Sequence, residues 1–225
     1  MSSIVDRRSS IVYPFIRIKG YIERSALSNA PVAVLCALGC LCAADARAQD
    51  VIDWSPDARL AIRDFQGRPP VNAAGASLSW LNVEAEWECQ AGALFATARA
   101  TFDPSRSWWR GSRMASIGAR RSSARRARAE AERSVVQFDL QLLEHEQLHF
   151  DIAELAARKL RARFDAFKDA CDEQDDSERI RKMVADIDRE MYAEQQRYDR
   201  ETAHGINVRA QDHWRKRIRA LLQNR

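Results

Sequence analysis

The sequence of 225 residues lacks three features that would define large classes of protein. It has no internal repeat of 20–50 residues, which excludes solenoids and propellers. Its apolar run near the N-terminus, Pro31–Ala44, has only 14 residues, whereas a membrane span needs about 20. It also lacks a strong excess of charge, because the net charge is only +4. With 46% hydrophobic and 30% charged residues, the chain has the composition of a folded protein and not of a disordered one.

The short apolar run near the N-terminus has the flanks of a secretion signal. Basic residues precede it, and Ala46-Arg47-Ala48 places small residues at the two positions that a signal peptidase reads. We therefore predict that residues 1–48 form a signal peptide with a long positive flank, cleaved after Ala48, and that the protein is periplasmic or extracellular. The alternatives are an N-terminal membrane anchor, a buried core helix, or lipid attachment at Cys40.

Cleavage of residues 1–48 would change the charge balance of the chain. It removes six basic and three acidic side chains and leaves 30 and 29. A chain so evenly balanced carries no global field that would attract an acidic partner. We therefore expect no nucleic acid as a partner, and no stable membrane span once the signal is removed.

Cysteine is scarce after the predicted cleavage site, where only Cys89 and Cys171 remain. Two cysteines in an exported chain predict one disulfide bond. The closed loop would hold about 80 residues, for which chain entropy predicts roughly 4 kcal/mol of stabilisation. The alternative is a pair of free buried thiols.

An arginine-rich segment with adjacent tryptophans, at about residues 103–133, is the least regular part of the chain. A basic run with aromatic residues can bind a polyanion. Because the remaining chain is balanced in charge, we interpret this segment as a solvated loop that leads into a helix. The alternative, a polyanion-binding module, predicts binding that weakens steeply with salt.

The pattern of apolar residues predicts an α+β fold, with a small antiparallel sheet followed by a helical half. Residues 77–101 alternate between apolar and polar side chains, which indicates a hairpin with its turn at Gln90-Ala91-Gly92. Spacings of three and four residues predict helices over 134–170, 178–204 and 211–222, with Gly205 as the terminator of the second. Residues 49–225 are expected to form a single domain.

The motif His145-Glu146-Gln147-Leu148-His149 lies in the first and longest predicted helix. Histidines four residues apart project side by side, close enough to share one zinc ion. Both lie on the apolar stripe, where an unpartnered polar group would be costly to bury. Glu146 is placed to accept a proton from zinc-bound water and to pass it to the leaving amine. The motif therefore predicts a Zn²⁺ site with His145 and His149 as ligands and Glu146 as the general base.

A catalytic zinc site needs a third protein ligand, which we expect in Tyr198–Gly205 at the end of the second predicted helix. If His204 binds the metal, the site holds three histidines, with Glu201 or Asp199 in support. If Glu201 binds the metal instead, His204 or Tyr198 is free to stabilise the oxyanion. We predict His204 as the third ligand, with Glu201 as the alternative.

Four stretches carry a resemblance to a known family. They are 142–161 (LLEHEQLHFDIAELAARKLR), 198–205 (YDRETAHG), Gln211 with Trp214, and 64–69 (DFQGRP). Together they resemble a bacterial family of uncharacterised exported proteins that are predicted to be secreted zinc-dependent proteases. The likeness covers most of residues 53–222. It implies a zincin-like domain that hydrolyses a peptide or protein substrate, with His145 and His149 as ligands and Glu146 as the base.

Two functions follow as hypotheses from these residues. The first is a secreted or periplasmic zinc-dependent metallopeptidase. The second is a non-catalytic protein of the cell envelope with a structural or vestigial metal site. The first predicts an open position at the metal, whereas the second predicts a closed site or none. The oligomeric state does not follow from the sequence.

Overall fold

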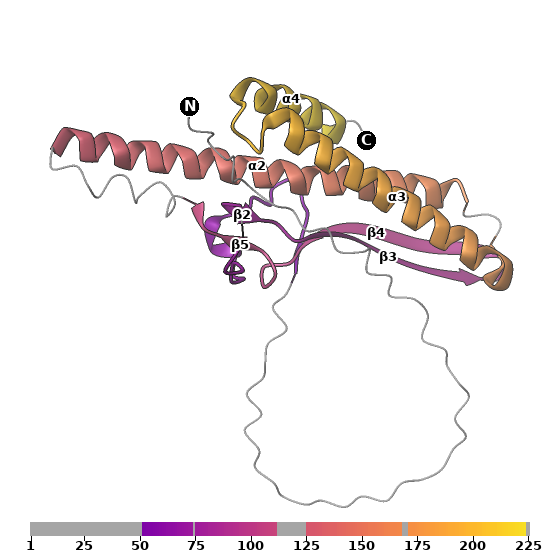
Figure 1. Ribbon diagram of the computed structural model, residues 1–225. Coiled ribbons are helices and arrows are strands. Elements are labelled where there is room, and N and C mark those ends of the chain that lie inside the picture. Colours follow the sequence, from indigo (N-terminus) through magenta and orange to yellow (C-terminus); the bar gives the residue numbers. More distant parts are fainter. Residues whose placement is uncertain (1–50, 74, 112–124, 168–170, 224–225) are drawn as a thin grey trace, which may run out of the picture.

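The computed structural model describes residues 51–73, 75–111, 125–167 and 171–223 (Figure 1). The predicted signal peptide, residues 1–48, lies outside this part of the chain, as do residues 112–124 of the arginine-rich segment. No helix within the described residues combines the length and the apolar character that a membrane span requires.

A long antiparallel hairpin forms most of the main sheet and confirms the predicted one. Strand β3 (Leu81–Gln90) pairs with β4 (Ala93–Phe102) along their whole length. The connecting residues Ala91 and Gly92 both have positive φ, 51° and 80°, which suits the tight turn of a two-residue hairpin. The short strand β1 (Ile52–Asp53) pairs with the end of β4, so that the strand order is β1-β4-β3.

The start of the predicted hairpin belongs to a second, smaller sheet. Strand β2 (Ser77–Leu78) pairs with β5 (Trp108–Trp109) and not with β4. The chain bends between β2 and β3, where the backbone N–H of Trp80 donates to the hydroxyl of Ser107. A short 3-10 helix, η1 (Ile62–Asp64), precedes these strands.

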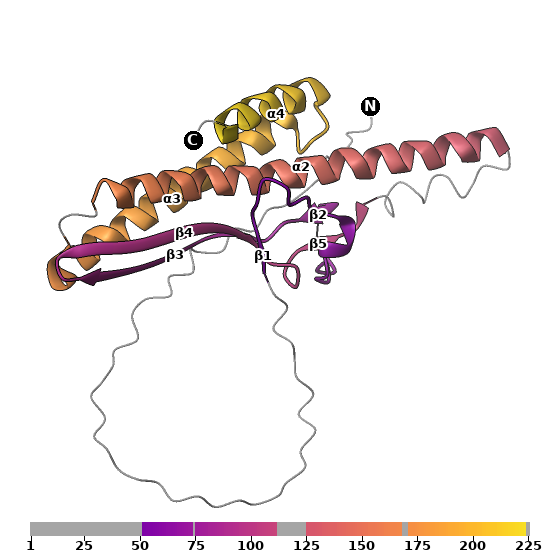
Figure 2. The same ribbon diagram turned by 180° about the vertical axis from the view of Figure 1, so that it is seen from behind.

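The main sheet is covered on one face by helices, and a further helix packs on these, which confirms the α+β architecture. The helices are α2 (Arg125–Asp165), α3 (Glu173–Thr202) and α4 (Val208–Gln223). Helix α2 lies along the β3–β4 hairpin, and α4 packs on the side of α2 and α3 that faces away from the sheet (Figures 1 and 2). The arginine-rich segment, 103–133, leads into a helix as predicted, because α2 begins at Arg125 and the last residues of the segment are helical.

The main core lies between the hairpin and the helices. The side chains at its centre are at most 1% exposed: Leu81, Val83, Phe102, Phe150, Leu160, Ile180 and Ile187. A second apolar cluster joins α2, α3 and α4: Leu148, Ile152, Tyr198, Trp214 and Ile218. Each large side chain buried in this way contributes about 1.5–3 kcal/mol. The two clusters fix the position of α3 on α2, and so determine which residues of the two helices face each other.

The predicted disulfide bond is present between Cys89 and Cys171. It joins the end of β3 to the residues just before α3, and the backbone N–H of Cys171 donates to the carbonyl of Gly92, 3.0 Å away. The bridge therefore ties the hairpin turn to the helical layer.

Candidate metal centre

The motif histidines lie on α2 and face α3 in the protein interior. His145, Glu146 and His149 have no exposed surface. Because the two histidines are one turn apart, their rings lie side by side, with centroids 4.6 Å apart. The two Nε2 atoms are 3.0 Å apart. The local spacing predicted from the sequence therefore brings two imidazoles to one point.

The third side chain at this point is Asp199, from α3. Its Oδ1 atom lies 3.1 Å from His145 Nε2 and 3.0 Å from His149 Nε2. The side chain is only 11% exposed. These three residues form a group that could hold a metal ion, since their donor atoms all lie within 4.8 Å of one another.

The two residues predicted as third ligand take other positions. Glu201 points away and accepts hydrogen bonds from the indole of Trp214 and the guanidinium of Arg197. His204 lies just past the end of α3, and its Nδ1 is 3.3 Å from Asp199 Oδ1. The structure thus places Asp199, which the sequence predicted only as support, beside both Nε2 atoms, while His204 lies against Asp199.

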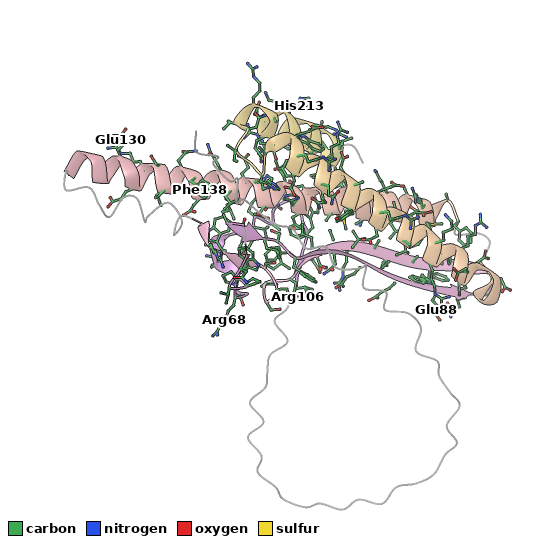
Figure 3. All side chains as sticks on the ribbon, in the orientation of Figure 1. Arg68, Glu88, Arg106, Glu130, Phe138 and His213 are labelled. Carbon is green, nitrogen blue, oxygen red and sulfur yellow. A yellow bond between two sulfur atoms is a disulfide. The ribbon has the colours of Figure 1, made fainter. Side chains whose placement is uncertain are left out.

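The fourth histidine of the chain, His213, takes no part in this group. It is exposed on α4 (Figure 3), as its place in the amphipathic C-terminal helix suggests. In contrast, Gly205 lies against the group, just past the end of α3 as predicted.

Electrostatics at the group favour an ionised carboxylate. Burial lowers the pKa of His145, and the charge of His149 lowers it further. Burial acts in the same direction on His149, but the charge and hydrogen bond of Asp199 outweigh it and raise its pKa. Burial opposes ionisation of Asp199, yet the charge of His149 and the hydrogen bonds from the three histidines, His204 included, hold its pKa well below the usual range. The group therefore presents a negative oxygen beside two imidazole nitrogens.

The donor set fits a transition-metal ion such as zinc. Zinc takes imidazole nitrogen and carboxylate oxygen at about 2.0–2.2 Å, which in a tetrahedron separates neighbouring donors by about 3.4 Å. The three separations here are 3.0–3.1 Å, so a small outward movement of the side chains would accommodate the ion. Two imidazoles and one carboxylate are also a donor set that catalytic zinc sites use, with a fourth position left open.

Glu146 is held from the small sheet. Its two carboxylate oxygens accept hydrogen bonds from the hydroxyls of Ser77 and Ser79, each at 2.5 Å. All three side chains are buried. The segment that carries the serines is fixed in turn, because Ala76 accepts backbone hydrogen bonds from Arg110 and Gly111. The sequence did not predict these contacts with Glu146, because Ser77 was expected at the start of the hairpin.

Two buried glutamines contact the outer nitrogens of the histidines. Gln195 Oε1 faces His149 Nδ1, and Gln195 Nε2 donates to the backbone carbonyl of His149. Gln211 Oε1 lies 3.4 Å from His145 Nδ1. It also accepts a hydrogen bond from Tyr198, whose ring stacks on His145. The signal for Gln195 in the sequence is its position one helical turn before Asp199.

The close approach of Gly205 to His145 leads to a prediction on stability. Gly205 has φ of +84°, and a Cβ atom there would lie 3.1 Å from His145 Cβ. We expect Gly205→Ala to destabilise the protein by more than about 1 kcal/mol, the usual cost of alanine at positive φ. It should also weaken metal binding, because His145 must shift. Urea unfolding and a zinc titration measure the two effects.

Gly92 provides a matched control for this substitution. It has a similar φ of +80°, but a Cβ atom there would meet nothing within 4 Å. Gly92→Ala should therefore show the backbone cost alone, with metal binding unchanged. Equal losses of stability in the two variants, with metal affinity intact in both, would contradict the contact with His145.

Comparison with known families finds one match. Residues 117–205 match the model of a bacterial protein family of unknown function, DUF922. This part of the chain is less than half of it, but it contains His145, Glu146, His149, Asp199 and His204. No match was found among curated proteins or among solved structures. The expected likeness to an uncharacterised bacterial family is thus confirmed for the two helices that carry the candidate metal centre.

Proposed function

We propose that this protein is an exported zinc-dependent peptidase of the zincin-like kind. His145, His149 and Asp199 hold the metal, and Glu146 is the general base. The observation that carries the proposal is that His145 Nε2, His149 Nε2 and Asp199 Oδ1 lie within 3.1 Å of one another. The buried carboxylate of Glu146 directly follows His145 on α2. A zinc ion bound there lowers the pKa of water and polarises a substrate carbonyl.

The protein's own side chains would then carry out the proton transfers. Glu146 takes a proton from the attacking water as the new C–O bond forms, and delivers it to the amine as the C–N bond breaks. Ser77 and Ser79 fix the orientation of that carboxylate through its two oxygens. Because Glu146 has no exposed surface, a peptide reaches it only when the residues that bury it move aside.

The disulfide bond supports the exported location in this proposal. A bridge such as Cys89–Cys171 persists in the periplasm or outside the cell and is rare in a reducing cytosol. The partner in this proposal is a peptide or protein substrate, and no nucleic acid is expected.

Glu146→Gln tests the catalytic half of the proposal. The variant is expected to retain stoichiometric zinc but to lose at least about 100-fold in the cleavage of casein or a peptide library, the usual contribution of a general base. Zinc content is measured by mass spectrometry on the chain that starts at residue 49.

Glu144→Gln is the matched control, because Glu144 lies half a turn away on α2 and pairs with Arg215 at the surface. Its activity should stay at the wild-type level. If Glu146→Gln cleaves as fast as Glu144→Gln, Glu146 is not the base.

A second function has one specific observation in its favour. Glu146 is wholly buried, and both of its oxygens are engaged by Ser77 and Ser79, as in a carboxylate with a structural role. The protein would then be a non-catalytic component of the cell envelope in which the metal stabilises the contact of α2 with α3. This alternative predicts that zinc raises the melting temperature while no peptide is cleaved, and that Glu146→Gln lowers stability more than Glu144→Gln does.

A further inference from the structure

Both ends of the Gln195 amide form hydrogen bonds with the same residue, His149. Gln195 lies on α3 one turn before Asp199 and has no exposed surface. Its Nε2 lies 2.9 Å from the backbone carbonyl oxygen of His149, and its Oε1 faces Nδ1 of the same residue. The side chain thus spans from the backbone of α2 to the imidazole ring.

The backbone carbonyl determines which way this amide lies. A carbonyl oxygen can only accept a hydrogen bond, so it must face the NH₂ group of Gln195. The amide oxygen is then the atom that faces Nδ1. An amide oxygen also only accepts, so Nδ1 of His149 must carry a hydrogen. In the neutral ring, Nε2 is therefore the nitrogen with the free lone pair. It faces His145 and Asp199, and in the metal-free protein it can carry a second hydrogen, which Asp199 accepts.

The corresponding contact at His145 has no such constraint. Gln211 Oε1 is 3.4 Å from His145 Nδ1 and accepts from the hydroxyl of Tyr198. Within the described part of the chain, Gln211 Nε2 is buried without a hydrogen-bond partner. A hydroxyl both donates and accepts, so it does not determine the orientation of this amide. Of these two glutamines, Gln195 is therefore the one whose contacts determine the tautomer of the histidine beside it.

We propose that Gln195 is a positioning residue of the metal centre, which holds His149 as the Nδ1–H tautomer and so presents the lone pair of Nε2 to the metal. The inference rests on the metal-binding half of the proposed function and is independent of peptidase activity. Partners of this kind on the outer nitrogen of a ligating histidine typically contribute 10–100-fold to metal affinity.

The test uses the chain from residue 49 and two substitutions of Gln195. Gln195→Met keeps the length of the side chain but removes both hydrogen-bonding atoms. Gln195→Glu keeps an oxygen against Nδ1 but places its second oxygen against the His149 carbonyl, which should lower stability. Nitrogen-15 NMR of the metal-free protein reports which ring nitrogen of His149 carries the hydrogen, and competition with a chromophoric chelator gives the zinc affinity.

We expect Nδ1 of His149 to carry a hydrogen in the wild type, whether or not Nε2 also carries one. Gln195→Met should shift the ring toward Nε2–H and weaken zinc binding about 10–100-fold, whereas Gln195→Glu should keep the tautomer despite its lower stability. If the role of Gln195 were purely structural, the tautomer of His149 would instead change in every variant of lower stability, Gln195→Glu included. Gln211→Met removes the other buried glutamine and serves as the control, in which Nδ1 of His149 should keep its hydrogen.

Three results would overturn the proposal. One is a His149 in the wild type with no hydrogen on Nδ1, which needs no variant to be folded. Another is a Gln195→Met variant with the tautomer and the zinc affinity of the wild type. The third is a wild-type protein with the expected tautomer that binds no zinc, which ends the metal-binding role and the proposed function together. A protein that binds zinc but cleaves no peptide ends only the peptidase, and leaves the role of Gln195 intact.

Discussion

Replacing Asp199 with alanine is expected to weaken zinc binding by more than about 100-fold, beyond the loss usual for a residue that only supports a ligand. Asp199 supplies the one carboxylate oxygen of the group, within 3.1 Å of both Nε2 atoms. Without it, His145 and His149 remain as two protein donors, one fewer than a catalytic zinc site uses. The measurement is a titration with zinc against a chromophoric chelator, with bound metal counted after gel filtration.

Two further substitutions separate the candidates for the third ligand. Glu201→Ala should leave zinc affinity unchanged and cost about 1 kcal/mol in stability, because Trp214 loses its hydrogen-bond acceptor. His204→Ala should weaken zinc binding only about tenfold, because His204 faces the metal group through Asp199. The opposite ranking, with zinc lost in His204→Ala and retained in Asp199→Ala, would make His204 the third ligand.

The pair of histidines could be predicted from the sequence because it depends on one helix alone. A spacing of four residues brings His145 and His149 together whatever surrounds the helix. Which side chain of α3 joins the two histidines depends on which face of α3 packs against α2. Asp199, Glu201 and His204 lie within six residues, and the sequence favoured His204 or Glu201 as the ligand, with Asp199 only in support. The packing of Tyr198 between α2 and α4 places the neighbouring Asp199 beside the two histidines, and this packing arises from tertiary structure.

The strands show the same division between local and distant effects. Alternation of side chains and the turn at Ala91-Gly92 are local, and the hairpin was predicted to within a few residues. The pairing of Ser77 with Trp109 joins residues that are far apart in the chain, and nothing in the local pattern indicates it. The contact of Ser77 with Glu146 spans 69 residues. For this reason the contacts of Ser77 and Ser79 with Glu146 could not be predicted from the sequence.

Loss of the disulfide bond is expected to lower the free energy of unfolding by about 4 kcal/mol. The bridge joins Cys89 to Cys171, 82 residues apart, and a closed loop of this length strongly restricts the unfolded chain. The double variant Cys89→Ser/Cys171→Ser, or the wild type under reducing conditions, should therefore unfold at a clearly lower urea concentration. Guanidinium or urea denaturation followed by circular dichroism gives the difference.

The location of the bridge makes zinc affinity the control for this experiment. The bridge lies at the hairpin turn and the start of α3, at one end of the molecule, whereas Asp199 lies near the other end of α3 (Figure 1). Zinc affinity of the folded double variant should therefore match the wild type. An unchanged urea midpoint after reduction would show that the bridge contributes little.

A loss of about 4 kcal/mol would be a large part of the 5–15 kcal/mol that stabilises a typical domain. The protein would then depend on an oxidising compartment to stay folded, which agrees with export by the predicted signal peptide.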